Sequence, residues 1–330
     1  MNTRARSTVI LTICALIAVC VPTILIHFRV INAYIAQIIT LAGVNAIMAI
    51  SVNTITGITG QLSIGQAGFL AIGAYTTIFL TLDVGLPLPI SALAAGLFTA
   101  LFGFLIGFPT LKLTGDYLAI VTLGFGEIIR VVLTNLKPIT GGANGRRFTT
   151  IITMYSDLSF FIVTASLVII LALLQNFLRS TYGRAILAVR EDEVAANASG
   201  IHVFRYKMIG FVIASFIAGI GGSLYAMIVG FIKPDAASFN NSINYLIFVV
   251  LGGMGSMTGS ILAAYILTYL QEFLRFLRDY RLLIYPLILI FVMLFRPKGL
   301  LGMKEFSVVR AWNNISARVF HRPSPDKFVQ

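Results

Sequence analysis

Residues 88–107 read LPISALAAGLFTALFGFLIG, a run without a single charged side chain. As a helix rising about 1.5 Å per residue, a run of this length crosses a hydrocarbon core of roughly 30 Å. Similar runs recur along the 330-residue chain, which is 58% hydrophobic and only 11% charged. Membrane-spanning barrels are built from short alternating segments, which the sequence lacks. The sequence therefore predicts an all-α integral membrane protein, folded as a helix bundle.

About ten transmembrane helices are expected, separated by short polar or glycine-containing segments. One of them is too short to span a membrane alone and ends in the glycine cluster Gly252-Gly253-Met254-Gly255. Because glycine permits backbone turns that other residues resist, we expect a broken helix near 243–258. The expected helices cover residues 7–26, 32–51, 61–82, 88–107, 117–134, 158–178, 208–231, 243–253, 258–274 and 282–296.

The basic residues indicate how the helices are oriented. Most lysines and arginines fall in segments that ten crossings place on the side of the N-terminus, and basic loops are typically cytoplasmic. Both termini are therefore expected in the cytoplasm, although Arg275, Arg278 and Arg281 fall on the opposite side. The net charge of +12 is explained by this rule and does not indicate nucleic-acid binding. The chain divides into a transmembrane domain, 1–302, and a short basic cytoplasmic tail, 303–330.

One long cytoplasmic loop is expected at 179–207, and it contains the charged stretch GRAILAVREDEVAANASGI (183–201). Alanine, leucine, arginine and glutamate favour a helix, and Gly200 is a suitable stop. The helix would expose a polar stripe beside small side chains, with too little apolar surface to lie in lipid. It is either a docking helix for another protein or a solvated linker whose charges fix the topology.

Six segments, found in a fixed order, carry a resemblance to a known family. In this chain they read GQLSIGQAGFLAIGAY (60–75), GDYLAIVTLGFGEIIRVVL (115–133), ITGGANG (139–145), GRAILAVREDEVAANASG (183–200), VVLGGMGSMTGSILAA (249–264) and RPKGLLG (296–302). Together they resemble the LivM-type permease subunits of branched-chain amino-acid ABC importers. The resemblance covers about residues 40–302.

The resemblance implies a set of partners. Two cytoplasmic ABC ATPases would grip the 179–207 loop and supply ATP and Mg²⁺ chemistry, with no cofactor on this chain. A second, LivH-type permease and an extracytoplasmic amino-acid-binding protein would complete the importer, embedded in the lipid of a bacterial plasma (inner) membrane. The ITGGANG loop, with Arg146 and Arg147, would face the binding protein. The expected ATPase-coupling residues are Gly183, Arg184, Arg190, Glu191, Glu193, Ala195, Ala196 and Gly200.

The expected cargo is leucine, isoleucine and valine, moved by alternating access. Uncharged polar groups within a span can line a route for such a zwitterion without trapping it. Glu127 and Arg130 are neighbours at i, i+3 and would neutralise each other, either as a structural pair or with a role in gating. The glycines and alanines of 60–75 have a structural explanation, since small residues let helices approach closely. The translocation-path candidates are Asn45, Asn53, Gln61, Ser63, Gln66, Glu127 and Arg130.

Other functional classes fit the sequence less well. The chain has no G-x-x-x-x-G-K-[ST] phosphate loop, and it assembles no nucleophile with a base, so we expect neither an ATPase nor a membrane enzyme. A self-powered secondary transporter would favour ionisable pairs deep within several spans. An ABC permease for urea or short-chain amides is an alternative for the cargo.

Overall fold

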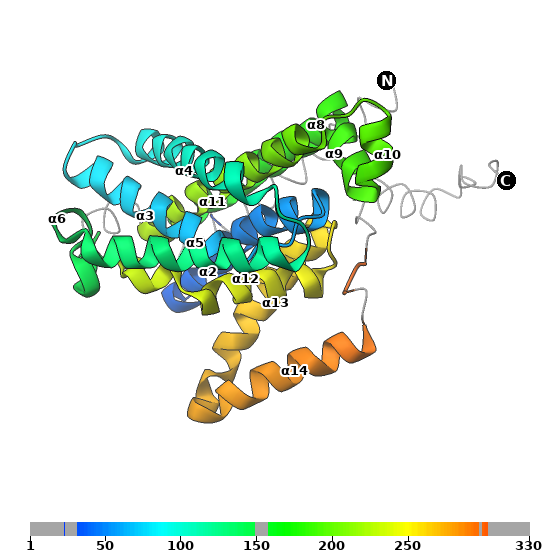
Figure 1. Ribbon diagram of the computed structural model, residues 1–330. Helices are drawn as coiled ribbons and strands as arrows, with labels where there is room; N and C mark the ends of the chain where they lie inside the picture. Colours follow the sequence, from blue (N-terminus) through cyan, green and yellow to red (C-terminus); the bar gives the residue numbers. More distant parts are fainter. Residues whose placement is uncertain (1–22, 24–31, 149–157, 297–298, 303–330) are drawn as a thin grey trace, which may run out of the picture.

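The computed structural model describes Thr23 and residues 32–148, 158–296 and 299–302. Within these residues the chain is a bundle of antiparallel helices with one small two-stranded sheet (Figure 1). The predicted helix 7–26, both termini and the tail 303–330 lie outside the described residues. The elements are α2 (Ala33–Asn53), η1 (Thr54–Ile58), α3 (Gln66–Leu82), α4 (Leu88–Thr110), α5 (Asp116–Asn135), α6 (Lys137–Thr140), η2 (Gly142–Asn144), β1 (Arg146–Arg147), α8 (Ser159–Arg179), α9 (Thr181–Glu191), α10 (Glu193–Ala198), α11 (Val203–Val229), β2 (Phe231–Ile232), η3 (Pro234–Ala237), α12 (Phe239–Gly252), α13 (Met257–Phe273), η4 (Leu274–Tyr280) and α14 (Arg281–Phe295).

Helix α11 forms the centre of the bundle, packed against α2, α3 and α4. Small residues bring these helices close together, as small-residue stripes do in membranes. A Cβ built on Gly73 of α3 would lie 2.3 Å from the carbonyl oxygen of Gly219 on α11. A Cβ on Gly222 would lie 2.0 Å from that of Leu70. The α3–α11 contact is thus backbone against backbone, and glycine is required on both helices.

Six helices within the described residues are long and apolar enough to cross a membrane: Ala33–Ile58 (α2 with η1), α4, α5, α8, α11 and Met257–Arg278 (α13 with part of η4). Helices α3 and α12 and the Leu283–Phe295 part of α14 are shorter. Each expected helix between 32 and 296 has a counterpart among these nine. Successive helices run in opposite directions, so α9 and α10 lie at one end of the bundle and α6 lies at the other (Figure 1).

Three expected boundaries are wrong for identifiable reasons. The helix expected from 61 begins at Gln66, because Gly60 turns the chain with a φ of 71° and the NH of Ile64 bonds the Thr122 hydroxyl. Helix α11 begins at Val203 rather than 208. The charge of Lys207 suggested a loop, but this residue lies within the helix, where its side chain is buried and paired. Helix α12 begins at Phe239 rather than 243, because its first turn is polar and does not stand out as part of an apolar run.

Candidate functional site

Two interruptions of helix lie against one another and form the candidate site. The first break, residues 59–65, separates the π-helical turn η1 from α3. The second break, residues 253–256, separates α12 from α13, where the sequence predicts a broken helix. Non-helical backbone at membrane depth is tolerated only when protein buries it or when it lines a cavity.

A hydrogen bond between Asn53 and Gly255 joins the C-terminal end of α2, just before η1, to the second break. The backbone NH of Gly255 donates to Asn53 Oδ1 over 2.8 Å. Gly57 has no room for a side chain, because a Cβ there would lie 2.3 Å from the nitrogen of Gly255. Gly253 and Gly255 adopt φ angles of 109° and 89°, which favour glycine. Gly57 of η1 is therefore needed for the close approach, and Gly253 and Gly255 for the turn.

Several polar side-chain atoms around the first break are buried without a hydrogen-bond partner. Gln61, Ser63 and Gln66 are all at least 97% buried. Neither amide atom of Gln61 has a hydrogen-bond partner, and the same holds for Ser63 Oγ and Gln66 Nε2. Asn53 Nδ2 is also unpartnered. Since an unsatisfied buried polar group costs about 1–3 kcal/mol, such a concentration calls for an explanation and makes the first break the candidate site.

Neighbouring helices support the first break with polar groups that the sequence does not single out. Thr122 on α5 accepts the NH of Ile64 (3.1 Å), and Ser242 on α12 accepts the NH of Ala67 (3.2 Å). Ser51 on α2 donates to Gln66 Oε1 (3.1 Å). These residues are hard to find from sequence, because serine and threonine are common in membrane helices and usually bond their own helix.

The remaining path candidates lie elsewhere. Asn45 donates to the hydroxyl of Thr268 on α13 (2.9 Å). Glu127 pairs with Arg130 (2.6 Å) and also accepts the NH of Phe239 at the start of α12 (3.2 Å). Arg130 in turn lies 3.6 Å from Asp235 of η3. In this structure the pair therefore connects α5 to η3 and to the start of α12. This geometry agrees with the first of the two alternatives, a structural pair.

The expected coupling helix is two helices, because Asp192 interrupts it and caps the second. Asp192 Oδ1 accepts the backbone NH groups of Val194 and Ala195, and no single helix runs from 184 to 198. Gly200 does end α10, with a φ of 80°. The cap turns α10 away from the axis of α9 at one end of the bundle (Figure 1).

The coupling candidates divide between the outer surface and the bundle. Glu193 pairs with Lys207 of α11 over 2.5 Å. Gly183 and Ala196 are buried, and Arg190 lies against both breaks. Arg184, Glu191 and Ala195 are exposed beside Val194, whose side chain is 80% exposed.

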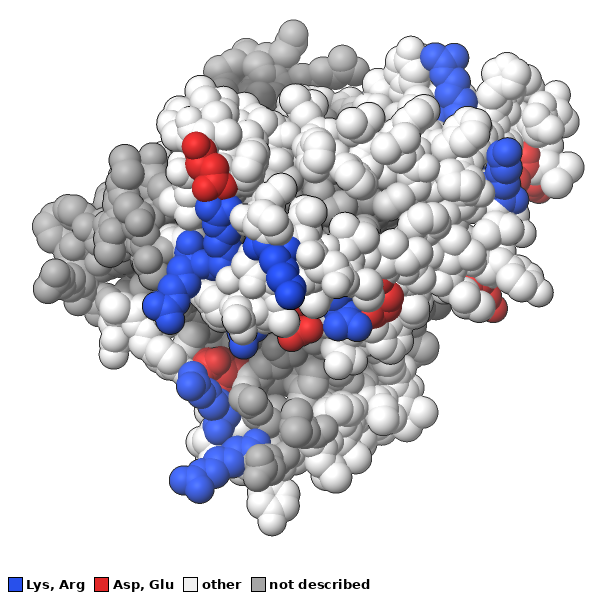
Figure 2. Space-filling model, turned by 60° about the vertical axis from the view of Figure 1, so that its left-hand side comes forward, with Lys and Arg blue, Asp and Glu red and all other residues white. Residues whose placement is uncertain are grey.

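The opposite end of the bundle carries ITGGANG and the two-stranded sheet, in which Arg146 pairs with Ile232 and Arg147 with Phe231. Arg146 also donates to Asp83 (2.7 Å) and to the carbonyl of Ile139. This guanidinium holds the pKa of Asp83 below its usual range, and the carboxylate raises the pKa of Arg146. Many of the charged side chains on this side of the molecule lie near one another, and a few others lie toward the right edge of the view (Figure 2). Arg147 stays exposed.

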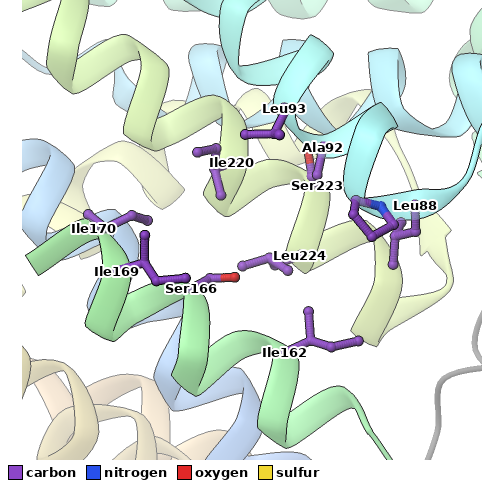
Figure 3. Close-up of a pocket in the computed structure, with 11 residues that line it drawn as sticks. Leu88, Ala92, Leu93, Ile162, Ser166, Ile169, Ile170, Ile220, Ser223 and Leu224 are labelled. Atoms are coloured by element: carbon purple, nitrogen blue, oxygen red, sulfur yellow. The ribbon is translucent and has the colours of Figure 1, made fainter. Parts of the chain in front are cut away.

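A cavity of about 300 Å³ lies between α4, α8 and α11. Its lining is apolar except for Ser166 and Ser223, and Ser223 is already bonded to Thr77 (Figure 3). An amino acid needs partners for an ammonium and a carboxylate group, and this lining offers no charged ones. We therefore do not regard this cavity as a cargo site.

Five of the six motifs behind the family resemblance meet at the two breaks, and the sixth, ITGGANG, lies at the opposite end of the bundle. Gly126 of α5 lies against Gly65 and Gly68, and Leu300 and Leu301 donate to the carbonyls of Leu251 and Gly252 beside the second break. Arg190 of α9 also lies against both breaks. The fold is that of a multi-pass membrane protein in which two helix breaks lie beside a charged loop.

Comparison with known proteins identifies the family. A family model described as branched-chain amino acid transport system / permease component matches residues 34–293. The chain therefore belongs to this permease family and is a multi-pass integral protein of the inner membrane.

Individual relatives agree with the family assignment. The high-affinity branched-chain amino acid transport system permease protein LivM of Escherichia coli (strain K12) is 38% identical over 296 residues, which cover 81% of this chain and 70% of the relative. LivM of Salmonella typhimurium matches equally well, at 38% over the same shares of the two chains. LivH of that organism, a permease protein of the same kind of system, is 25% identical over 82% of this chain and 95% of its own. No solved structure matches the chain.

Proposed function

We propose that this chain is one of two permease subunits of an ATP-driven importer for leucine, isoleucine and valine. The observation that carries the proposal is the pair of helix breaks, with their unpartnered buried amides, beside α9. The relatives' names support the cargo, and the likeness to both LivM and LivH supports a pair of related permeases. Two cytoplasmic ATPases and an extracytoplasmic binding protein complete the proposed assembly, with both termini of this chain in the cytoplasm.

The translocation route is proposed to pass the first break. Gln61, Ser63 and Gln66 offer uncharged donors and acceptors that can hold an ammonium or carboxylate group transiently. Their burial in the structure supports a route that is closed at this point. Alternating access would uncover them toward each side in turn.

The ATPases are proposed to dock on the exposed faces of α9 and α10. Arg184, Glu191, Ala195 and the neighbouring Val194 supply a surface of charges around small and apolar groups. Glu193 contributes differently from the expectation of a direct contact, since it fixes α10 to α11 through Lys207. At the other end, Arg147 lies free of the Asp83–Arg146 pair and is a contact candidate for an acidic patch on the binding protein.

A self-powered secondary transporter is less well supported. Among the described residues, Lys207 is the one charged residue in the buried class, and it pairs with Glu193 beside the cytoplasmic loop. Glu127 and Arg130 are each more than one-third exposed. Deep ionisable pairs, which proton- or ion-driven transporters use, are thus missing from the described spans.

The test is transport by the reconstituted assembly. The chain is purified with its co-expressed partners, placed in liposomes with ATP on the ATPase side, and supplied with the binding protein and labelled leucine. ATP-dependent uptake of leucine, with urea and acetamide excluded, is expected. Uptake of leucine by this chain alone, driven by an ion gradient without ATP, would overturn the proposal, and ATP-driven uptake of urea instead would replace its cargo.

A further inference from the structure

Arg190 lies where α9 meets both helix breaks. A Cβ built on Gly60 of the first break would lie 3.1 Å from Arg190 Cγ and 3.6 Å from its Cα. A Cβ built on Gly255 of the second break would lie 3.1 Å from Arg190 Nη1. The aliphatic stem of this arginine therefore covers one break, and its guanidinium reaches the other.

This placement turns Arg190 away from the surface available to an ATPase. Its side chain is only 20% exposed, whereas Glu191, the next residue, is 74% exposed. The two side chains are barely paired, at 4.0 Å. Ile186 and Val189 of α9 are buried on the same side as Arg190, so the helix is seated on the bundle along this face.

The glycines on the bundle side are required by the contact. Gly60 has a φ of 71° and Gly255 a φ of 89°, and any side chain there would meet Arg190. Asn53, the last residue of α2, holds the second break to the start of η1 through its bond with Gly255. A displacement of Arg190 would thus act on both breaks together, and the unpartnered amide of Gln61 follows directly after Gly60.

We propose that Arg190 is a positioning residue that transmits movement of α9 to both helix breaks, moving with them as one body. This inference rests on the proposed function, and it assigns Arg190 a role distinct from ATPase docking. Movement of α9 driven by ATP would pull the first break, with Gln61 and Ser63, and the second break in a single step. For the parts to move together, the contact between them must persist through the movement, which an arginine packed against both breaks allows.

The first experiment compares Arg190→Gln with Arg205→Gln in the reconstituted assembly. Arg205 is an exposed arginine at the start of α11 that lines a groove with Phe104 and Phe108 of α4, so it controls for loss of positive charge on this end. For Arg190→Gln we expect the ATPases to co-purify and hydrolyse ATP at the native rate, while leucine moved per ATP falls about tenfold, a usual size for coupling between sites. Arg205→Gln should keep the native ratio. A native ratio for Arg190→Gln would overturn the inference, and absence of ATP-driven uptake by the native assembly would overturn the proposed function with it.

The second experiment replaces the contact with a covalent one. The Cβ positions of Gly60 and Arg190 are 3.6 Å apart, within the range of about 3.5–4.5 Å found in disulfides. With Cys14 and Cys20 changed to serine, the pair Gly60→Cys and Arg190→Cys is compared with Gly60→Cys alone, which reports the strain of the added side chain. If the parts move together, the oxidised pair should match that control and reduction should lower its transport. An oxidised pair that is inactive, and regains transport on reduction, would mean that Arg190 must leave the break, and would overturn the inference.

Discussion

The contact between α3 and α11 gives the most direct quantitative prediction. A Cβ at Gly222 would lie 2.0 Å from the carbonyl oxygen of Leu70 and 2.9 Å from the nitrogen of Ala74. Ordinary contact begins at 3.4 Å, so Gly222→Ala requires the two backbones to separate locally by about 1.4 Å. The opposing atom belongs to the backbone and cannot rotate away.

We expect Gly222→Ala to lower the free energy of unfolding by about 3 kcal/mol, the upper end of the usual cost of overpacking. The matched control is Gly124→Ala on α5, where nothing lies within 4 Å of an added Cβ. That substitution should be neutral or stabilising by about 0.5–1 kcal/mol, because alanine favours helix over glycine.

The assay is thermal unfolding of each variant in mild detergent, followed by the fraction that stays monodisperse after heating. Gly222→Ala should unfold several degrees below the native chain, and Gly124→Ala at or above it. Equal midpoints for the two variants would refute the argument, because they would show that α3 and α11 are not in backbone contact.

Three further substitutions test the site. Gln61→Leu should leave stability unchanged or raise it by about 1 kcal/mol, because it removes an unpartnered buried amide, while leucine uptake falls about tenfold; a thermal midpoint that falls with normal uptake would contradict this. Glu193→Gln should lower the free energy of unfolding by roughly 2 kcal/mol, less than for a fully buried pair, because Glu193 is half exposed. Adding Lys207→Met should restore most of the loss, and no recovery in thermal unfolding would argue against the ion pair. Because Arg146 lowers the pKa of Asp83, their pair stabilises the fold above the ordinary aspartate pKa and stops doing so as pH falls through the lowered one. The difference in free energy of unfolding between native and Asp83→Asn protein should thus be small at pH 7, under about 1 kcal/mol, and vanish in acid. A difference that grows in acid would show the opposite sign.

The sequence by itself determined the membrane class, most helix positions and the second break. Long uncharged runs have few alternatives to a buried helix, because every backbone polar group must be satisfied within the segment. Glycine clusters such as 252–255 predict a turn for an equally local reason, because glycine adopts backbone angles that other residues resist. The family resemblance, carried by ordered motifs, agreed with the family match.

Only the tertiary structure decided what the polar residues do. Gln61 and Ser63 lie in a break rather than on a helix. The backbone NH of Ile64, which would bond within a helix, instead donates to the hydroxyl of Thr122, far away in the chain. In the sequence, Arg190 and Glu193 are both simply charged residues of one loop. In the structure Arg190 lies against the two breaks, whereas Glu193 is paired with Lys207. Hydropathy and spacing describe a helix one segment at a time, whereas these roles depend on which segments meet, and that is fixed by packing between residues up to two hundred positions apart.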